Sequence, residues 1–186
     1  MSLKKLPILA LILYFLGATS ALALKVRDLN VAPYRDYLLL YAYLEDFPQE
    51  DFREATRHGL GLSFTFHIQI YRIRRFLRDE KIFDQEITRV VYYDPVKNIY
   101  YVQTVGAPEA PRRAPSFRQA LWLAANLEGI PLMPLVRLQP KTRYRLKLKA
   151  EVRKIARVGW PKKIIRFLLF KGESLESSWT SLVFSL

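Results

Sequence analysis

One stretch of the sequence places four basic side chains at every second position. These residues are Arg143, Arg145, Lys147 and Lys149, and apolar or aromatic residues stand between them. A period of two is typical of a β-strand, whose alternate side chains share one face at spacings of about 6.6–6.8 Å. The cations would then form a row about 20 Å long, which can contact phosphate or carboxylate groups. We interpret this row as a candidate anion-binding surface.

The excess charge of the chain comes from the same region. Residues 141–171 hold 12 Lys or Arg and one acid, Glu151, which gives this segment a net charge of +11 out of +13 for the whole chain. The candidate site is therefore extended to Arg153, Lys162 and Lys163. An asymmetry of this kind indicates an anionic partner, such as an anionic lipid, a glycan or an acidic protein.

The cationic strand also has a protective interpretation. Natural sheets place Lys and Arg on exposed edge strands, where these side chains hinder pairing with other molecules. On that reading the residues from Arg143 to Lys149 form an edge strand and bind nothing. The sequence leaves both alternatives open.

A second segment combines apolar bulk with flanking lysines. Its candidate membrane-interface residues are Trp160, Ile164, Ile165, Phe167 and Leu168. Apolar and aromatic residues beside cations suit a helix that lies in the headgroup region of a bilayer. The same residues also suit a helix that covers the protein core. Peripheral membrane contact is one expectation for this segment.

The sequence contains no recognisable catalytic motif. It has two histidines and no cysteine, and no nucleophile elbow, phosphate-binding glycine loop or zinc-protease motif. We expect no metal, no cofactor and no catalytic residue, and a binding protein rather than an enzyme. The alternative is a periplasmic hydrolase-like enzyme that uses His67 or the carboxylates of Asp79, Asp84 and Glu86.

The first 23 residues have the layout of a secretory signal peptide. Two lysines precede an apolar run, and Ala21-Leu22-Ala23 supplies a small-residue cleavage site. We expect cleavage after Ala23 and export to the periplasm or envelope, although Leu6–Leu24 is close to the length of an uncleaved anchor. Export removes nucleic acid from the expected partners.

The rest of the chain is mostly predicted as β-strands. Strands are expected over 24–31, 37–44, 60–70, 86–93, 99–105, 143–153 and 178–186, with 132–138 at best an edge strand. Short helices are expected over 49–58 and, after a capping box at Ser116, up to Gly129. Residues 106–115 are expected to form a loop.

This order of elements predicts a mainly β (α+β) fold. We expect residues 24–186 to form a single antiparallel, β-sandwich-like domain with two short inserted helices. A small outer-membrane barrel is the second alternative, because its walls also show a period of two.

Several of these segments together resemble a known protein family. They are residues 54–64, the Arg-rich stretch ending at Asp79, the hairpin from Tyr92 to Val102, 117–121 with 131–132, 144–152 and 178–179. In these stretches the chain resembles an uncharacterised family of exported bacterial proteins, domain-of-unknown-function family 4390. The resemblance implies a periplasmic or envelope setting and no established catalytic residues. We therefore expect an exported envelope protein that binds or scaffolds, of undetermined oligomeric state.

Overall fold

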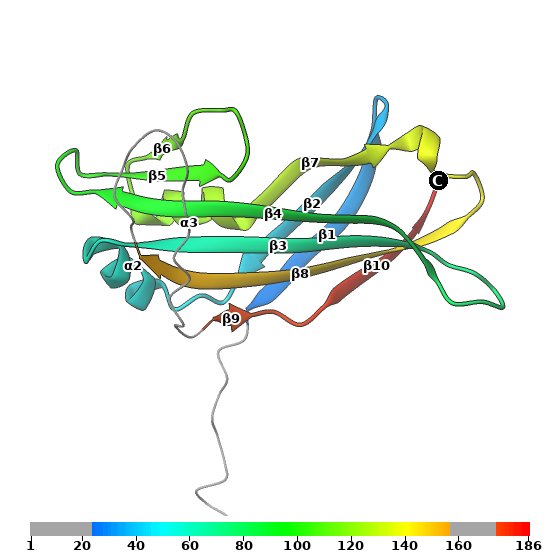
Figure 1. Cartoon of the computed structure of the whole chain (residues 1–186), viewed down its shortest axis with the longest axis horizontal. Coiled ribbons are helices and arrows are strands. Elements are labelled where there is room, and N and C mark those ends of the chain that lie inside the picture. The colour runs from blue at the N-terminus through cyan, green and yellow to red at the C-terminus, as the bar shows by residue number, and fades with distance from the viewer. Residues whose placement is uncertain (1–23, 157–173) are drawn as a thin grey trace, which may run out of the picture.

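The protein is built from two antiparallel β-sheets that pack face to face (Figure 1). The computed structural model describes residues 24–156 and 174–186. In this part of the chain, one sheet has the order β1-β2-β7 and the other the order β10-β8-β3-β4-β5-β6, with the short β9 beside β8. The predicted mainly β, sandwich-like fold with two short helices is confirmed.

The three-stranded sheet contains β1 (Lys25–Tyr34), β2 (Tyr37–Glu45) and β7 (Asn126–Pro134). The seven-stranded sheet contains β3 (Leu60–Arg72), β4 (Glu80–Asp94), β5 (Ile99–Thr104), β6 (Arg112–Ala114), β8 (Arg143–Ala156), β9 (Leu175–Glu176) and β10 (Thr180–Ser185). In Figure 1 the strands of the smaller sheet lie behind the larger one and run steeply across it.

The alternation in β3 explains how the larger sheet faces the core. Leu62, Phe64, Phe66, Ile68 and Ile70 are each at most 1% exposed and belong to one hydrophobic cluster that also includes residues of β2, β7 and β8. The residues between them point to the opposite side, as the period of two in a strand requires. We call that opposite side of the seven-stranded sheet the outer face.

Helices α2 (Gln49–Arg57) and α3 (Phe117–Ala125) cover the inner side of the larger sheet at one end (Figure 1). Phe47 connects the ring of Phe52 in α2 to that of Phe64, at centroid distances of 6.5 and 5.8 Å. Gly59 follows α2 with φ +86°, a conformation that favours glycine. The Ser116 hydroxyl accepts the Gln119 N–H and so caps α3.

Three predicted segments have different bounds in the structure. The expected loop 106–115 contains the short strand β6, which pairs with β5. The helix expected to reach Gly129 ends at Ala125, because the chain turns extended at Asn126 and pairs with β2 through Asn126 and Leu127. In that region sheet pairing outweighs helix propensity. β7 is an edge strand, as predicted for 132–138. Its bounds differ, because it begins at Asn126 and ends at Pro134, where a 3-10 turn over Leu135–Arg137 follows.

The interpretation of 143–153 as an exposed edge strand is wrong. β8 lies between β3 and β10, and β9 pairs with its C-terminal half. Both sides of its backbone are therefore hydrogen-bonded to neighbours over most of its length. The cations of β8 have no edge to protect.

Arg89 of β4 caps the C-terminal end of α3 from outside the helix. Its guanidinium donates to the carbonyl oxygens of Leu123 at 2.9 Å and Asn126 at 2.5 Å. Helix α3 has no basic residue in its own last turn, so Arg89 supplies the positive charge that favours a helix C-terminus. Burial is the main cause that lowers the pKa of Arg89, yet an arginine remains protonated at neutral pH.

We predict that Arg89→Met lowers the free energy of unfolding by about 2–3 kcal/mol, because charged hydrogen bonds are lost and helix carbonyls are left unpaired. Urea denaturation measures the change. The matched control is Arg113→Met in β6, whose exposed side chain should alter stability by less than about 0.5 kcal/mol. Equal unfolding midpoints for the two variants would rule out the capping role.

Some predictions fall outside the described residues. These are the signal peptide over 1–23, the cations Lys162 and Lys163, and the membrane-interface residues Trp160, Ile164, Ile165, Phe167 and Leu168. Within 24–156 and 174–186, no helix combines the length and apolar character needed to cross a bilayer.

Candidate anion-binding site

The structure places the predicted cations of β8 in one row on the outer face. β8 pairs with β3 so that Arg145 stands opposite Tyr71, Lys147 opposite Gln69 and Lys149 opposite His67. The apolar residues between these cations are buried against the other sheet. The period of two therefore correctly predicted which side chains of β8 share a face.

Two of the four cations in this row pair with acids that lie far away in the sequence. Arg145 donates to Asp79 at 2.6 Å and Lys149 to Glu176 at 2.5 Å, while Arg153 pairs with Glu151. The ammonium of Lys147 lies 5.3 Å from the centre of the Tyr71 ring. The row thus contains two ion pairs, one cation beside an aromatic ring and Arg143, rather than four unpaired charges.

Lys149 and Glu176 join β8 to the short strand β9. The hydrogen bond from Lys149, followed by its positive charge, lowers the pKa of the Glu176 carboxyl. A lowered pKa means that the pair stabilises the fold above the ordinary titration range of Glu and that this contribution disappears as the pH falls. We predict that Lys149→Met raises the pKa of Glu176 toward its usual value, measured by carboxyl NMR titration. An unchanged pKa would show that the pair does not persist in solution.

Beside this row the outer face contains a hollow of about 500 Å³. Its lining includes Ser63, Thr65, His67, Glu86, Thr88, Val105, Glu151, Arg153 and Ile155. His67 Nδ1 lies 3.5 Å from Glu86 Oε2, and Glu151 is only 9% exposed beside Arg153. The hollow therefore brings one histidine and two carboxylates onto one face.

The other acidic residues considered for catalysis lie elsewhere. Asp79 pairs with Arg145, and Asp84 accepts a hydrogen bond from Lys81 at 2.5 Å, which lowers the pKa of the Asp84 carboxyl. Neither residue lines the hollow. Among the described residues, no three His, Asp or Glu side chains gather closely enough to hold a metal ion.

Several exposed cations without acidic partners lie together at one end of the sandwich, while others, including Lys97, Arg113 and Arg118, lie elsewhere in the fold. The set that we call the cationic end consists of Arg75, Arg78, Arg137, Lys141 and Arg143. All five residues are exposed, and none of them makes an ion pair with a residue that the structure describes. Of these five, the predicted site contained only Arg143.

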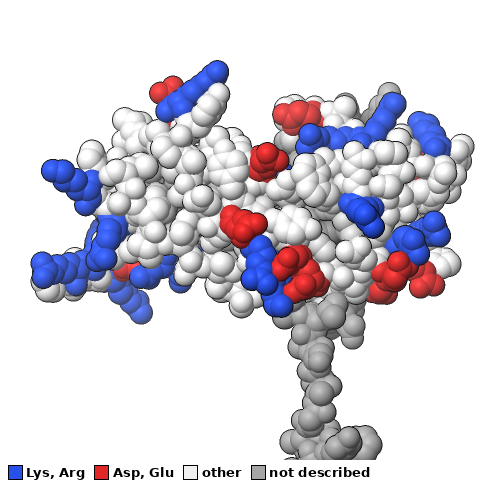
Figure 2. Space-filling view, turned by 180° about the vertical axis from the view of Figure 1, so that it is seen from behind, with Lys and Arg blue, Asp and Glu red and all other residues white. Residues whose placement is uncertain are grey.

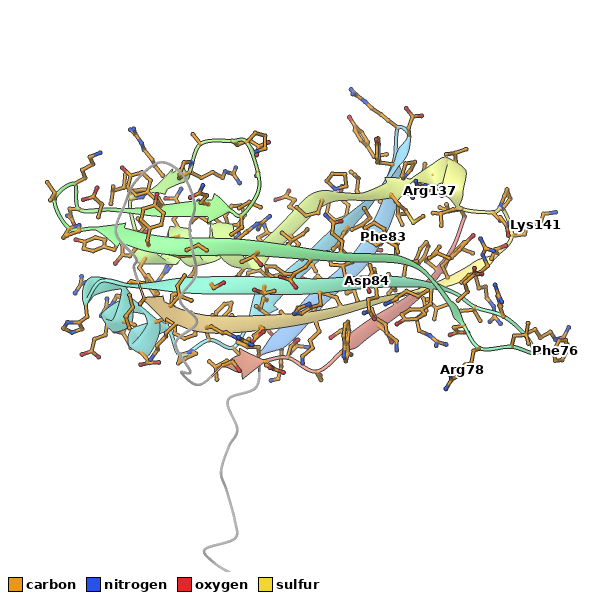
Figure 3. All side chains as sticks on the ribbon, viewed as in Figure 1. Phe76, Arg78, Phe83, Asp84, Arg137 and Lys141 are labelled. Carbon is orange, nitrogen blue, oxygen red and sulfur yellow. The ribbon has the colours of Figure 1, made fainter. Side chains whose placement is uncertain are left out.

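The figures show how this end differs from the rest of the molecule. In Figure 2 the end at the left is dominated by Lys and Arg, whereas the opposite end mixes both signs of charge. In Figure 3 Arg78, Lys141 and Arg137 lie at that same end, although they come from three different segments. The neighbouring turn between β1 and β2 carries Arg35 and Asp36, whose charges offset each other.

The connection between β3 and β4 forms the projecting part of the cationic end. Its base is held by Glu80, which pairs with Arg72 and Arg74, and by the Asp79–Arg145 ion pair. The Ile73 N–H donates to the Arg143 carbonyl at 2.9 Å, so this connection lies beside the start of β8. The acids near the loop are thus engaged at its base, while Arg75 and Arg78 beyond them are left without acidic partners.

This arrangement suits electrostatic contact with an extended anion. Guanidinium and ammonium groups donate charge-assisted hydrogen bonds to phosphate and carboxylate oxygens. Because the cations lie at the same end of the sandwich, they can face an anionic surface together. The sequence signal that could have located this end is the run from Arg72 to Arg78, which holds four arginines and no acid.

The comparisons with known proteins give one match. No curated protein matches the chain, and no solved structure does. One family model, described as "Domain of unknown function (DUF4390)", matches residues 21–183. Since this match covers most of the chain, including both sheets and the cationic end, the protein belongs to the DUF4390 family.

Proposed function

We propose that the protein is an exported, envelope-associated binding protein whose cationic end docks on an anionic surface. The observation that carries this proposal is the excess of cations over acids at this end, whereas the opposite end carries both signs of charge (Figure 2). Arg75, Arg78 and Lys141 have no acidic partner among the described residues, and the nearby acids Asp79 and Glu80 are already engaged by arginines at the base of the loop. Unpaired charge on one face produces a directed field, and this field attracts phosphate or carboxylate groups.

The proposed setting is the periplasm or the cell envelope. The layout of residues 1–23 predicts export with cleavage after Ala23. Leu24 would then be the first residue of the mature protein. It is 2% exposed and bridges to Ser177, so the mature chain would be held in the fold from its first residue. Outside the cytoplasm the available polyanions are lipid headgroups, glycans and acidic proteins.

The proposal predicts that binding depends on charge at this end alone. Arg75→Ala combined with Arg78→Ala removes two cations, each worth about 1 kcal/mol near an anionic membrane, so affinity should fall roughly 30-fold. Binding is measured by cosedimentation of the protein, purified from the envelope, with vesicles containing anionic phospholipid. A soluble anionic polysaccharide serves as a parallel ligand that distinguishes a glycan from a lipid surface.

The matched control removes two cations from the other end. Lys97 and Arg118 are exposed, and Lys97 lies in the β4–β5 turn, far from the cationic end (Figure 1). Lys97→Ala combined with Arg118→Ala changes the net charge equally and should leave binding nearly unchanged. Equal losses in the two double variants would mean that net charge, rather than a specific end, governs the interaction, and would refute the proposed site.

The hollow supports a second candidate function, a hydrolase-like activity. His67 and Glu86 lie 3.5 Å apart, and a carboxylate that accepts from a histidine can orient it as a general base. This candidate predicts turnover of at least one chromogenic ester, phosphate or glycoside, and loss of that turnover in His67→Ala. If no substrate in such a panel is hydrolysed above background, binding remains the function that the site supports.

A further inference from the structure

The apex of the β3–β4 connection exposes two large apolar side chains in succession. Phe76 is 88% exposed and Leu77 is 69% exposed. They are flanked by Arg74 and Arg75 on one side and Arg78 on the other, so the apex reads Arg-Arg-Phe-Leu-Arg. In Figure 3 Phe76 stands at the far end of the molecule, beyond the last paired residues of both strands.

Single exposed apolar residues are normal on a protein surface and need no explanation. The pair at the apex differs in its position and in its neighbours. The side chains project from the outermost point of a long hairpin, and cations surround them on the same loop. The guanidinium carbon of Arg75 lies 5.3 Å from the centre of the Phe76 ring, which leaves the outer part of the ring free.

We infer that this loop is a membrane anchor, in which Phe76 and Leu77 enter an anionic bilayer while the surrounding cations bind its headgroups. The inference rests on the proposed function and names its partner as a lipid surface rather than a glycan or a protein. Aromatic and apolar residues partition into the boundary between headgroups and acyl chains. Arginine side chains reach back from that depth to the phosphates.

The hairpin is suited to insertion because its base is held in place. Ion pairs of Glu80 with Arg72 and Arg74 connect its two strands, and the Ile73–Arg143 hydrogen bond attaches it to β8. A loop that is already ordered loses less conformational entropy on binding. The cations Lys141 and Arg143 stand beside the base of the hairpin, where headgroups would lie if the apex were inserted.

The charges at the base also explain why insertion stops at the apex. Asp79 and Glu80 carry negative charge on the strand that leaves the loop, and each is engaged by an arginine. Moving these ion pairs into the hydrocarbon would carry a large desolvation cost. The anchor is therefore shallow and limited to the loop between Ile73 and Asp79.

The first test removes the apolar character and keeps every charge. Phe76→Ser combined with Leu77→Ser should weaken binding to anionic vesicles about 10- to 100-fold, since the burial of two apolar side chains is lost. Because both side chains are exposed, the double variant should fold with unchanged thermal stability. Val96→Ser is the matched control: Val96 is 92% exposed in the β4–β5 turn, and its loss should leave binding unchanged.

The second test reports the depth of the loop directly. The chain has no cysteine, so Leu77→Cys introduces a single site for an environment-sensitive fluorophore. Adding anionic vesicles should shift its emission to the blue and increase its intensity. The same fluorophore at Val96→Cys should show no shift.

The outcomes separate this inference from the proposed function. One combination of results refutes the anchor and leaves surface docking standing. In that case Arg75→Ala with Arg78→Ala abolishes vesicle binding, the double serine variant binds normally, and the emission of the fluorophore at Leu77→Cys does not shift. If the wild-type protein binds the soluble anionic polysaccharide but not anionic vesicles, only the anchor is refuted, and if it binds no anionic ligand at all, both fail. The wild-type protein could also bind soluble polyglutamate as tightly as vesicles while vesicles cause no emission shift at Leu77→Cys. That result would overturn the inference in favour of an acidic protein partner.

Discussion

Tyr144→Ala is expected to lower the free energy of unfolding by about 3–5 kcal/mol, the usual cost of deleting a large buried aromatic side chain. Tyr144 is fully buried at the start of β8 and stacks on Phe184 of β10 at a centroid distance of 5.6 Å. Its hydroxyl accepts the backbone N–H of Gln139 at 2.7 Å. The side chain therefore fills the core and fixes the segment that leads into β8.

This variant should also affect binding, because Lys141 and Arg143 lie between Gln139 and Tyr144. Tyr144→Phe keeps the ring and removes only the hydrogen bond, so it should cost about 1 kcal/mol. Urea denaturation followed by tyrosine and tryptophan fluorescence measures both values. If the alanine and phenylalanine variants lose the same stability, the ring does not contribute to the core as the structure indicates.

The second large effect concerns charge at the cationic end. Reversing three cations, with Arg75→Glu, Arg78→Glu and Lys141→Glu, removes about 3 kcal/mol of attraction to an anionic membrane and adds repulsion. Affinity for anionic vesicles should therefore fall more than about 100-fold. Surface charges contribute little to folding, so thermal stability should change only slightly.

Salt provides an independent check on this variant. Wild-type binding to anionic vesicles should weaken as salt rises, because exposed charges are screened beyond about 8 Å at physiological ionic strength. The reversed variant should show little binding at any salt concentration. Retention of tight, salt-dependent binding by the reversed variant would place the binding surface elsewhere, with the outer face of β8 as the next candidate.

Local patterns in the sequence predicted most of the strands. The alternation from Leu60 to Ile70 and from Arg143 to Arg153 depends only on neighbours in the chain, and both segments are strands with the expected buried face. Gly59 and Ser116 likewise act locally, as a positive-φ residue and a helix cap. Such signals are readable because the side-chain period and the capping geometry are properties of the backbone.

The electrostatic character of β8 could not be predicted in this way. The acids that neutralise Arg145 and Lys149 are Asp79 and Glu176, which are 66 and 27 residues away in the sequence. These partners are set by strand order, which a periodicity does not specify. Because the strand order could not be predicted, an edge position for β8 was compatible with the sequence. In the structure β8 lies between β3 and β10.

The cationic end was hidden for a related reason. Its members come from the β3–β4 connection, the region of the 3-10 turn and the start of β8, and only the fold brings them together. A search for charge-rich segments favours 141–171, because it counts charges and not their partners. The excess of cations over acids in the structure moves the candidate site from the middle of β8 to one end of the sandwich.

Hydrogen–deuterium exchange of the wild-type protein, with and without anionic vesicles, tests the central claim most directly. We predict slower amide exchange in 73–79 and 137–143 when vesicles are present, and no change in the β4–β5 turn around Val96. Protection of that turn, or of the hollow around His67 instead of the cationic end, would contradict the account.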